Sequence, residues 1–171
     1  YAARRTSLPV VLHGASQGGE VAFHALDAFP AVTAGVCTNI LLNHEVPMSP
    51  AIRLFRSRPA TWAAKAIGDR LRVPLRRVID FEAAYQEDPG LLDTKKNDPY
   101  YVWRYGLESY HSVFNYAPPK PAAANTKPVL VTCGEHDEIV GADHCRACFE
   151  RIGETKDFFV MPGGGHQLML F

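Results

Sequence analysis

The feature that most constrains the fold is a glycine–serine turn near the start of the 171-residue chain. Residues 14–18, Gly-Ala-Ser-Gln-Gly, follow an apolar run and precede a helix-like segment that begins at Gly19. A turn this sharp brings backbone segments close together, so its flanking positions favour glycine, which has no Cβ. The serine is held at the tip, where the first N–H groups of the helix also point. In this context the pattern predicts a nucleophile elbow, although the pattern alone also occurs in ordinary turns.

The segments on either side of the turn predict a βαβ unit. Residues 8–13 form a continuous apolar run, which is typical of a strand buried on both faces. A helix is predicted over residues 17–29, and Pro30 ends it because proline cannot continue a helix. A second strand is predicted over residues 35–42. Strand, helix and strand in this order, with a helix of about 12 residues, indicate neighbouring strands of a parallel sheet.

The C-terminal part of the chain predicts two more strands, over residues 127–133 and 157–161, with a helix over residues 139–152 between them. A further helix is predicted from Gln167 to the end of the chain. The predicted fold class is therefore α/β, with a mostly parallel sheet and helices on both faces.

Between these parts lies an insertion in which prolines punctuate short helical stretches, with no convincing core strand. Helices are predicted over residues 57–72 and from Asp98, where an aspartate cap precedes proline at the first helical position. Packing is the simplest explanation of its many Tyr and Trp side chains, and an apolar substrate tunnel is the alternative. The chain thus divides into residues 1–43, a helical cap or lid over residues 44–126, and residues 127–171.

Three chemically capable side chains lie just past the ends of three predicted strands: Ser16, Asp137 and His166. Ligands of open parallel sheets bind at the carboxyl ends of the strands, so these side chains are expected to meet. A serine hydroxyl is a poor nucleophile until an imidazole takes its proton, and a carboxylate must hold that imidazole in one tautomer. The order Ser, Asp, His along the chain is the one expected when this chemistry is built on an α/β-hydrolase sheet.

Together these residues resemble the C-terminal two-thirds or so of an α/β-hydrolase fold enzyme with a helical cap. They are most similar to the lysophospholipase and monoglyceride-lipase-like group. The resemblance rests on VLHGASQGG at residues 11–19, PVLVTCGEHD at residues 128–137 and MPGGGH at residues 161–166. Residue 15 is alanine where many members of the group have histidine, a change that working esterases tolerate.

This resemblance implies a role for each residue. Ser16 is the nucleophile, His166 the general base and then the general acid, and Asp137 the carboxylate that orients the histidine. The backbone N–H of Gln17 supplies one donor of the oxyanion hole. The second donor normally comes from a loop after an earlier strand, which this sequence lacks. Because the chain also opens at Tyr1 without methionine, we expect an upstream part of the same protein to carry the N-terminal strands and to complete the fold.

Other acids and bases compete with these candidates. The carboxylates close to Asp137 in sequence are Glu135, Glu138 and Asp143, and the sequence alone does not exclude them. Asp137 is favoured because it lies three residues past the glycine that ends the strand. The rival histidines are less well placed than His166, which follows a strand and a flexible glycine run; they are His13, His44, His111 and His136.

A zinc site is a further alternative. Cys145 and Cys148 form a C-x-x-C pattern with His144 beside them and His136 upstream, and such side chains are the ligands that zinc prefers. The sequence has no second ligand pair at finger-like spacing, and the segment is predicted to be a helix. Metal binding is therefore the less favoured interpretation.

Charge and hydropathy exclude several classes of partner. Lys and Arg total 18, as do Asp and Glu, so the formal net charge is zero and nothing favours nucleic acid. No apolar run approaches the roughly 20 residues that span a bilayer. A signal peptide would lie upstream, so the localisation stays open, with a soluble cytoplasmic protein favoured.

The predicted function is hydrolysis of carboxylic esters through an acyl-enzyme, with no metal or organic cofactor. The aromatic insertion favours a small-molecule ester with an apolar acyl or aromatic group. Cleavage of thioesters, amides or carbon–carbon bonds, and acyl transfer, use the same triad on this fold and stay open. A non-catalytic binding protein on the same scaffold is the alternative from another class, although binding alone needs none of the three residues.

Overall fold

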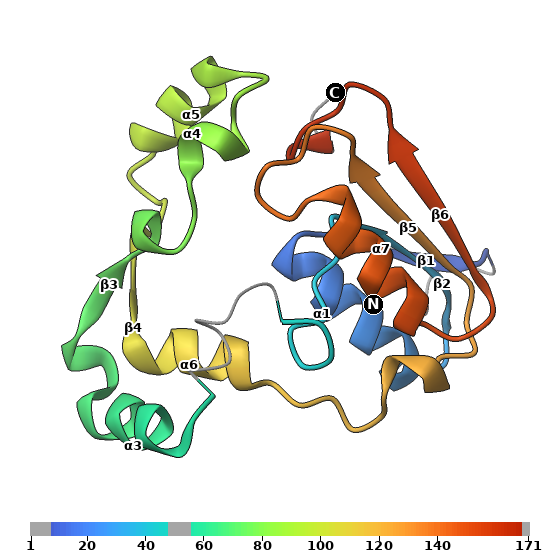
Figure 1. Cartoon of the computed structure of the whole chain (residues 1–171), viewed down its shortest axis with the longest axis horizontal. Coiled ribbons are helices and arrows are strands. Elements are labelled where there is room, and N and C mark those ends of the chain that lie inside the picture. Colours follow the sequence, from blue (N-terminus) through green and yellow to red (C-terminus); the bar gives the residue numbers. More distant parts are fainter. Residues whose placement is uncertain (1–7, 48–55, 169–171) are drawn as a thin grey trace.

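The computed structural model describes residues 8–47 and 56–168 of the chain. Its main sheet has four strands in the order β1-β2-β5-β6, with all neighbouring strands parallel (Figure 1). The strands are β1 (Val10–Ala15), β2 (Val32–Thr38), β5 (Val129–Gly134) and β6 (Lys156–Met161). Because the strands are parallel, their carboxyl ends lie at one edge of the sheet, where ligands of such folds bind. The predicted α/β fold class and parallel sheet are confirmed.

Helices α1 (Gln17–Ala28) and α7 (Ala142–Arg151) pack on the same face of this sheet. Phe23 and Leu26 of α1 and Cys148 of α7 lie in one buried cluster with Cys37 and Val131 of the strands. Successive side chains of a strand point to opposite faces, so the residues between these point away from the helices. The sequence predicts helices on both faces of the sheet, and the described helices α1 and α7 cover this one.

In the part of the chain that the structure describes, the opposite face of the sheet exposes apolar side chains to solvent. Its large apolar side chains include Val11, Leu130, Phe159 and Met161, which are 37% to 51% exposed. Strand β1 is an edge strand whose side chains alternate between partly buried and exposed along most of its length. The prediction that residues 8–13 are buried on both faces is therefore wrong for the described residues, because α1 covers only one face of β1.

Strand β2 ends four residues earlier than predicted, at Thr38. Asn39 has φ +50°, in the left-handed region that asparagine tolerates better than most residues, and the chain leaves the sheet there. Ile40, Leu41 and Leu42 are buried, yet they lie outside the ladder that joins β2 to β5. The apolar run continues past the end of the strand because residues 40–42 are buried after the chain has left the sheet. The predicted strand is therefore too long.

The insertion consists of short elements between β2 and β5, beside the sheet in Figure 1. Its α-helices are α3 (Arg58–Ile67), α4 (Phe81–Ala84), α5 (Pro89–Lys96) and α6 (Leu107–Asn115). Strands β3 (Arg72–Pro74) and β4 (Arg104–Gly106) pair antiparallel, apart from the main sheet. Its 3₁₀ turns are η2 (Gly68–Arg70) and η3 (Leu75–Arg77), and η4 (Ala122–Ala124) follows before β5.

Two helix predictions in the insertion need correction. Helix α3 ends at Ile67, before the predicted residue 72, because Gly68 has φ +54° and stops the helix. The helix predicted from Asp98 begins only at Leu107, as α6. The Asp98 carboxylate does not cap a helix; it accepts a hydrogen bond from the backbone N–H of Tyr100 at 2.8 Å, in a local turn.

The insertion has its own apolar core. Phe81, Tyr85 and Leu92 are buried there, with Trp103 and Tyr101 packed against them. The Phe81 and Trp103 rings meet edge to face with centroids 5.2 Å apart. Tyr85, Tyr101 and Trp103 therefore pack within the insertion, whereas Trp62 and Tyr100 are 74% and 90% exposed. Ile139, which follows β5, packs against this core as well as against the core of the sheet.

None of the described helices is a candidate membrane span. No helix of residues 8–47 and 56–168 is both long and apolar enough to cross a bilayer. The helix predicted from Gln167 falls mostly on residues outside those that the structure describes.

Candidate active site

Ser16 lies at the tip of the turn between β1 and α1. Its backbone has φ 53° and ψ −126°, a conformation that is rare for a residue with a side chain. Its N–H donates to Thr38 O at 2.8 Å, and its carbonyl accepts from Gly19 N–H at 2.9 Å. The turn is thus held both by the neighbouring strand and by the helix that follows it.

The two glycines that flank this turn differ in their surroundings. A Cβ on Gly14 would lie 2.1 Å from Gly18 O and 2.9 Å from Ala22 Cβ, so only glycine fits. A Cβ on Gly18 would meet nothing within 4 Å among the described residues. The steric argument from the sequence therefore applies to Gly14 and not to Gly18. Gln17 is the first residue of α1, so its N–H has no acceptor inside the helix.

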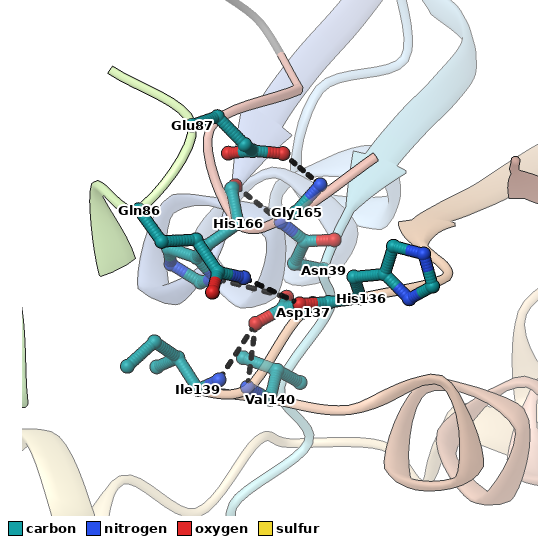
Figure 2. A network of polar contacts seen from close by, with 9 residues as sticks. All are labelled: Asn39, Gln86, Glu87, His136, Asp137, Ile139, Val140, Gly165 and His166. Atoms are coloured by element: carbon teal, nitrogen blue, oxygen red, sulfur yellow. Dashed lines mark hydrogen bonds and ion pairs between the residues drawn. The ribbon is translucent and has the colours of Figure 1, made fainter. Parts of the chain in front are cut away.

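Asp137 and His166 are in contact. Asp137 Oδ2 lies 2.9 Å from His166 Nδ1, and Oδ1 accepts from the backbone N–H groups of Ile139 at 2.8 Å and Val140 at 3.0 Å (Figure 2). Their side chains are 0% and 9% exposed, so this pair is shielded from water. An ionised carboxylate only accepts, which places the proton on Nδ1 and leaves Nε2 as the basic nitrogen.

The protonation state of Asp137 follows from its surroundings. Burial by itself raises the pKa of a carboxyl group. The hydrogen bond and charge of His166, with the two backbone amides, outweigh that effect and bring the pKa of Asp137 below its ordinary value. Asp137 is therefore a carboxylate at neutral pH, which is the form that orients an imidazole.

The glycine run before His166 crosses the end of β5 at close range. A Cβ on Gly134 would lie 2.2 Å from Gly165 O, and His136 N–H donates to Gly164 O at 2.8 Å. Only Gly163 has a positive φ among the glycines of this run. Close packing, and not the flexibility expected from the sequence, accounts for glycine at positions 134, 164 and 165, and the positive φ accounts for it at position 163.

The end of β2 joins the serine turn to the histidine loop. Thr38 O accepts from Ser16 N–H, and the Asn39 side-chain Nδ2 donates to His166 O at 2.6 Å. The three candidates thus lie past the ends of β1, β5 and β6 at one edge of the sheet. Among the described residues no hydrogen bond joins Ser16 Oγ to His166 Nε2. The structure therefore brings Asp137 and His166 into contact and holds Ser16 through a shared neighbour.

The rival acids and histidines have other positions. Glu135, Glu138 and Asp143 are exposed, and within the described chain none of them bonds to His166. The rival histidines contact other residues or lie exposed: His13 with Thr38, His44 with Arg56, His111 with Thr61, and His136 at the surface. His166 and Asp137 alone form the expected imidazole–carboxylate contact in this part of the molecule.

The cysteines do not form the zinc site considered from the sequence. All four are free and buried, and His144 Nε2 lies 3.4 Å from Cys148 Sγ. In residues 8–47 and 56–168 no three His, Cys, Asp or Glu side chains gather as metal ligands. The Cys145 thiol is hydrogen-bonded to Cys133, and this hydrogen bond, together with burial, raises the pKa of Cys145. These are the properties of packed thiols.

One buried charged group near the turn escaped the sequence analysis. Glu20 is 2% exposed, and its Oε2 accepts from Gln17 Nε2 at 2.7 Å and from Asn43 Nδ2 at 2.9 Å. Its Oε1 accepts from Asn43 N–H at 2.9 Å. Burial raises the pKa of Glu20 despite these hydrogen bonds. The sequence contains one sign of this buried group, namely an acidic residue in the first turn of a helix that is expected to pack on the sheet.

A cavity of about 610 Å³ opens beside the candidate pair. It is lined by Gln86 and Glu87 of the insertion and by residues of the two loops: Glu135, His136, Asp137, Glu138 and Gly163. It borders the acid loop, and neither Ser16 nor His166 is among the residues that line it.

Comparison with solved structures defines the class of fold. The chain is similar to the crystal structure of a monoacylglycerol lipase from Paleococcus ferrophilus, with a TM-score of 0.70, 20% identity, and coverage of 98% of this chain and 64% of that one. It is also similar to a soluble variant of monoglyceride lipase from Saccharomyces cerevisiae, with a TM-score of 0.66, 15% identity, and coverage of 96% and 56%. An α/β hydrolase from Penicillium, GrgF, matches with a TM-score of 0.65, 19% identity, and coverage of 94% and 57%. The chain has the α/β-hydrolase fold and spans less than two-thirds of these proteins.

The family follows from the sequence as a whole. The family model described as Serine aminopeptidase, S33, matches residues 1–170, so the chain belongs to that family of hydrolases. Comparison with curated proteins found no match. The resemblance to the monoglyceride-lipase-like group that the motifs indicated is confirmed.

Proposed function

We propose that this chain carries the nucleophile, base and acid of a serine hydrolase that cleaves carboxylic esters. The observation that carries the proposal is the buried contact between Asp137 and His166, beside a serine held in a strained turn. Binding alone would need none of these features. Two of the similar solved structures are lipases of monoacylglycerol, which favours an ester over an amide or a thioester.

The chemistry would proceed through an acyl-enzyme. His166 Nε2 takes the hydroxyl proton of Ser16 as Oγ bonds to the ester carbonyl carbon, and the carbonyl π electrons move to oxygen. The N–H of Gln17 stabilises this oxyanion, with a second donor from the upstream part of the protein. The intermediate collapses when the ester C–O bond breaks, and the leaving alkoxide takes the proton from Nε2.

Water then completes the cycle. It gives a proton to His166 Nε2 as its oxygen bonds to the acyl carbon, and Ser16 Oγ leaves with that proton. A carboxylic acid is released and the serine is regenerated. Asp137 keeps Nδ1 protonated and stabilises the imidazolium that forms in each half. We propose that the insertion forms the cap over this site, that residues 1–43 and 127–171 form the hydrolase core, and that an apolar acyl or aromatic group is bound.

The test uses the full-length protein and p-nitrophenyl esters of graded acyl length. Ser16→Ala and His166→Ala are each expected to lower kcat by roughly 10⁴ to 10⁶. His136→Ala, an exposed histidine next to Asp137, serves as the matched control and should stay close to wild type. Full activity of Ser16→Ala would refute the proposal.

Covalent labelling distinguishes an enzyme from a binding protein on the same scaffold. A fluorophosphonate should label Ser16 in the wild type, and the label should be absent in Ser16→Ala. A protein that only binds esters would not react. Thioester and amide substrates tested beside the esters would separate the alternatives within the fold.

A further inference from the structure

The insertion contacts both loops that carry the candidate catalytic pair. Gln86 Nε2 donates to His136 O at 2.9 Å, and Glu87 Oε1 accepts from Gly165 N–H (Figure 2). His136 immediately precedes Asp137, and Gly165 immediately precedes His166. Two adjacent residues of the insertion thus bind the backbone next to the acid and next to the base.

We infer that Gln86 and Glu87 are positioning residues that hold Asp137 and His166 in place relative to each other, an inference that rests on the proposed function. The peptide that leads into His166 is hydrogen-bonded at two points. Its Gly165 N–H donates to the insertion, and the His166 carbonyl accepts from Asn39 at the end of β2. Removing either contact frees one end of this segment.

The loop that carries the two residues is itself well anchored. Tyr85, which precedes them, is 5% exposed and stacks on Phe81 in the core of the insertion. Asp88, which follows them, donates its N–H to Tyr85 O and accepts from Leu91 N–H at 3.1 Å, capping α5. Gln86 and Glu87 therefore project from a fixed turn.

The acid loop is also packed against the insertion. Ile139, whose N–H donates to Asp137, contacts the insertion core that contains Tyr85. The contact of Gln86 with His136 and this apolar contact connect the insertion to the acid loop, and the contact of Glu87 with Gly165 connects it to the histidine loop. The insertion and the catalytic pair are thus coupled by three contacts close together in space.

Glycine at position 165 matches this arrangement. A Cβ there would meet the Glu87 carboxylate, so a side chain would displace the glutamate from the loop. The glycine run of the histidine loop therefore provides the close approach that the insertion needs, as well as the crossing over β5. A role in orienting the pair accounts for both the contacts and the glycine.

The experiment measures kcat and KM of the full-length protein with p-nitrophenyl butyrate. Gln86→Ala and Glu87→Ala are each expected to lower kcat by about 10- to 100-fold, because small displacements of a reacting group have effects of this size. KM should change little. Glu87→Gln keeps an oxygen that can accept from Gly165 and should retain most of the wild-type kcat.

The control is Glu82→Ala, which removes an exposed carboxylate of α4 that lies 3.8 Å from Lys96 Nζ. Its kcat and thermal midpoint should match the wild type. Equal losses in Glu82→Ala and Glu87→Ala would overturn the inference, as would a Glu87→Gln variant as impaired as Glu87→Ala.

A readout independent of activity separates this inference from the proposed function. The NMR signals of the His166 ring should shift in Glu87→Ala, with the thermal midpoint unchanged. If Ser16→Ala keeps full activity, the proposed function fails, while the His166 signals still test the contacts. If Ser16 is essential but Glu87→Ala has wild-type kcat and unmoved His166 signals, the positioning role is wrong.

Discussion

The serine turn and the acid–histidine pair are built in different ways. The turn of Ser16 is shaped by residues near it in sequence, since Gly14 packs on Gly18 and Gly19 N–H donates to Ser16 O, and one distant contact, from Ser16 N–H to Thr38 O, joins it to β2. The Asp137–His166 pair is held by residues far apart in the chain. They are Asn39, Gln86, Glu87 and Gly134. A local motif therefore specifies the nucleophile, whereas the pair depends on the whole tertiary arrangement.

The largest expected effect tests the pair directly. Asp137→Asn would leave the shape of the loop but favour the wrong tautomer of His166, and should lower kcat by about 10⁴. The control Glu138→Gln changes an exposed neighbour and should be within twofold, roughly the range of a surface change. Steady-state kinetics with one ester suffices. Activity retained by Asp137→Asn would assign the acid to another residue.

The next effect compares the two glycines of the turn. Gly14→Ala places a Cβ against Gly18 O and should lower the free energy of unfolding by about 1 to 3 kcal/mol or more. Gly18→Ala enters open space in a helix and should gain up to about 1 kcal/mol, because alanine favours helix. Urea unfolding of both variants measures the difference. Equal effects would contradict the steric account.

A matching change in the second region is Gly134→Ala. The new Cβ would meet the carbonyls of Gly164 and Gly165, so the histidine loop must move. We expect a loss of about 1 to 3 kcal/mol in the free energy of unfolding. The His166 ring signals should shift as well, in contrast to Gly14→Ala, which disturbs the turn of Ser16. If the His166 signals did not shift in Gly134→Ala, the two glycine substitutions would affect His166 alike, and the contrast between the two regions would be refuted.

Two buried carboxyl groups should give opposite slopes of stability with pH. The pKa of Asp137 is lowered, so its contribution is present above the ordinary value of 3.8 and is lost as pH falls through the folded pKa. The pKa of Glu20 is raised, so its contribution is present below the ordinary value of 4.5 and is lost as pH rises through the folded pKa. Unfolding of Glu20→Gln and Asp137→Asn against wild type, across the acid range, measures both. Parallel curves for either pair would contradict the assigned direction.

The smallest effect concerns the contact between β2 and the histidine loop. Asn39→Gly keeps the left-handed backbone and removes the hydrogen bond to His166 O. The Asn39 Oδ1 atom is buried without a partner among the described residues, and its loss offsets part of the cost. We expect a net loss of about 1 kcal/mol, measured by urea unfolding. A loss as large as that of Gly134→Ala would mean that Asn39 is the main support of the loop.

Much of the sheet could be predicted because its signals are local. Runs rich in β-branched or aromatic residues marked β5 and β6 to within two residues at each end. Helix α1 matched its prediction except for the last residue. The errors came where a distant contact overrode a local signal. Asp98 looked like a helix cap, yet the chain beyond it continues into β4, which pairs with β3.

The sequence by itself determined the α/β class, the turn at Ser16 and the order of the three candidate residues along the chain. These follow from apolar periodicity and from the steric demands of a glycine, which act over a few neighbouring residues. Only the tertiary structure decided that Asp137, and not Glu135 or Glu138, contacts His166. It also decided that Gln86 and Glu87 bind both loops. Such contacts depend on how distant segments are packed together, and no spacing within one segment encodes them.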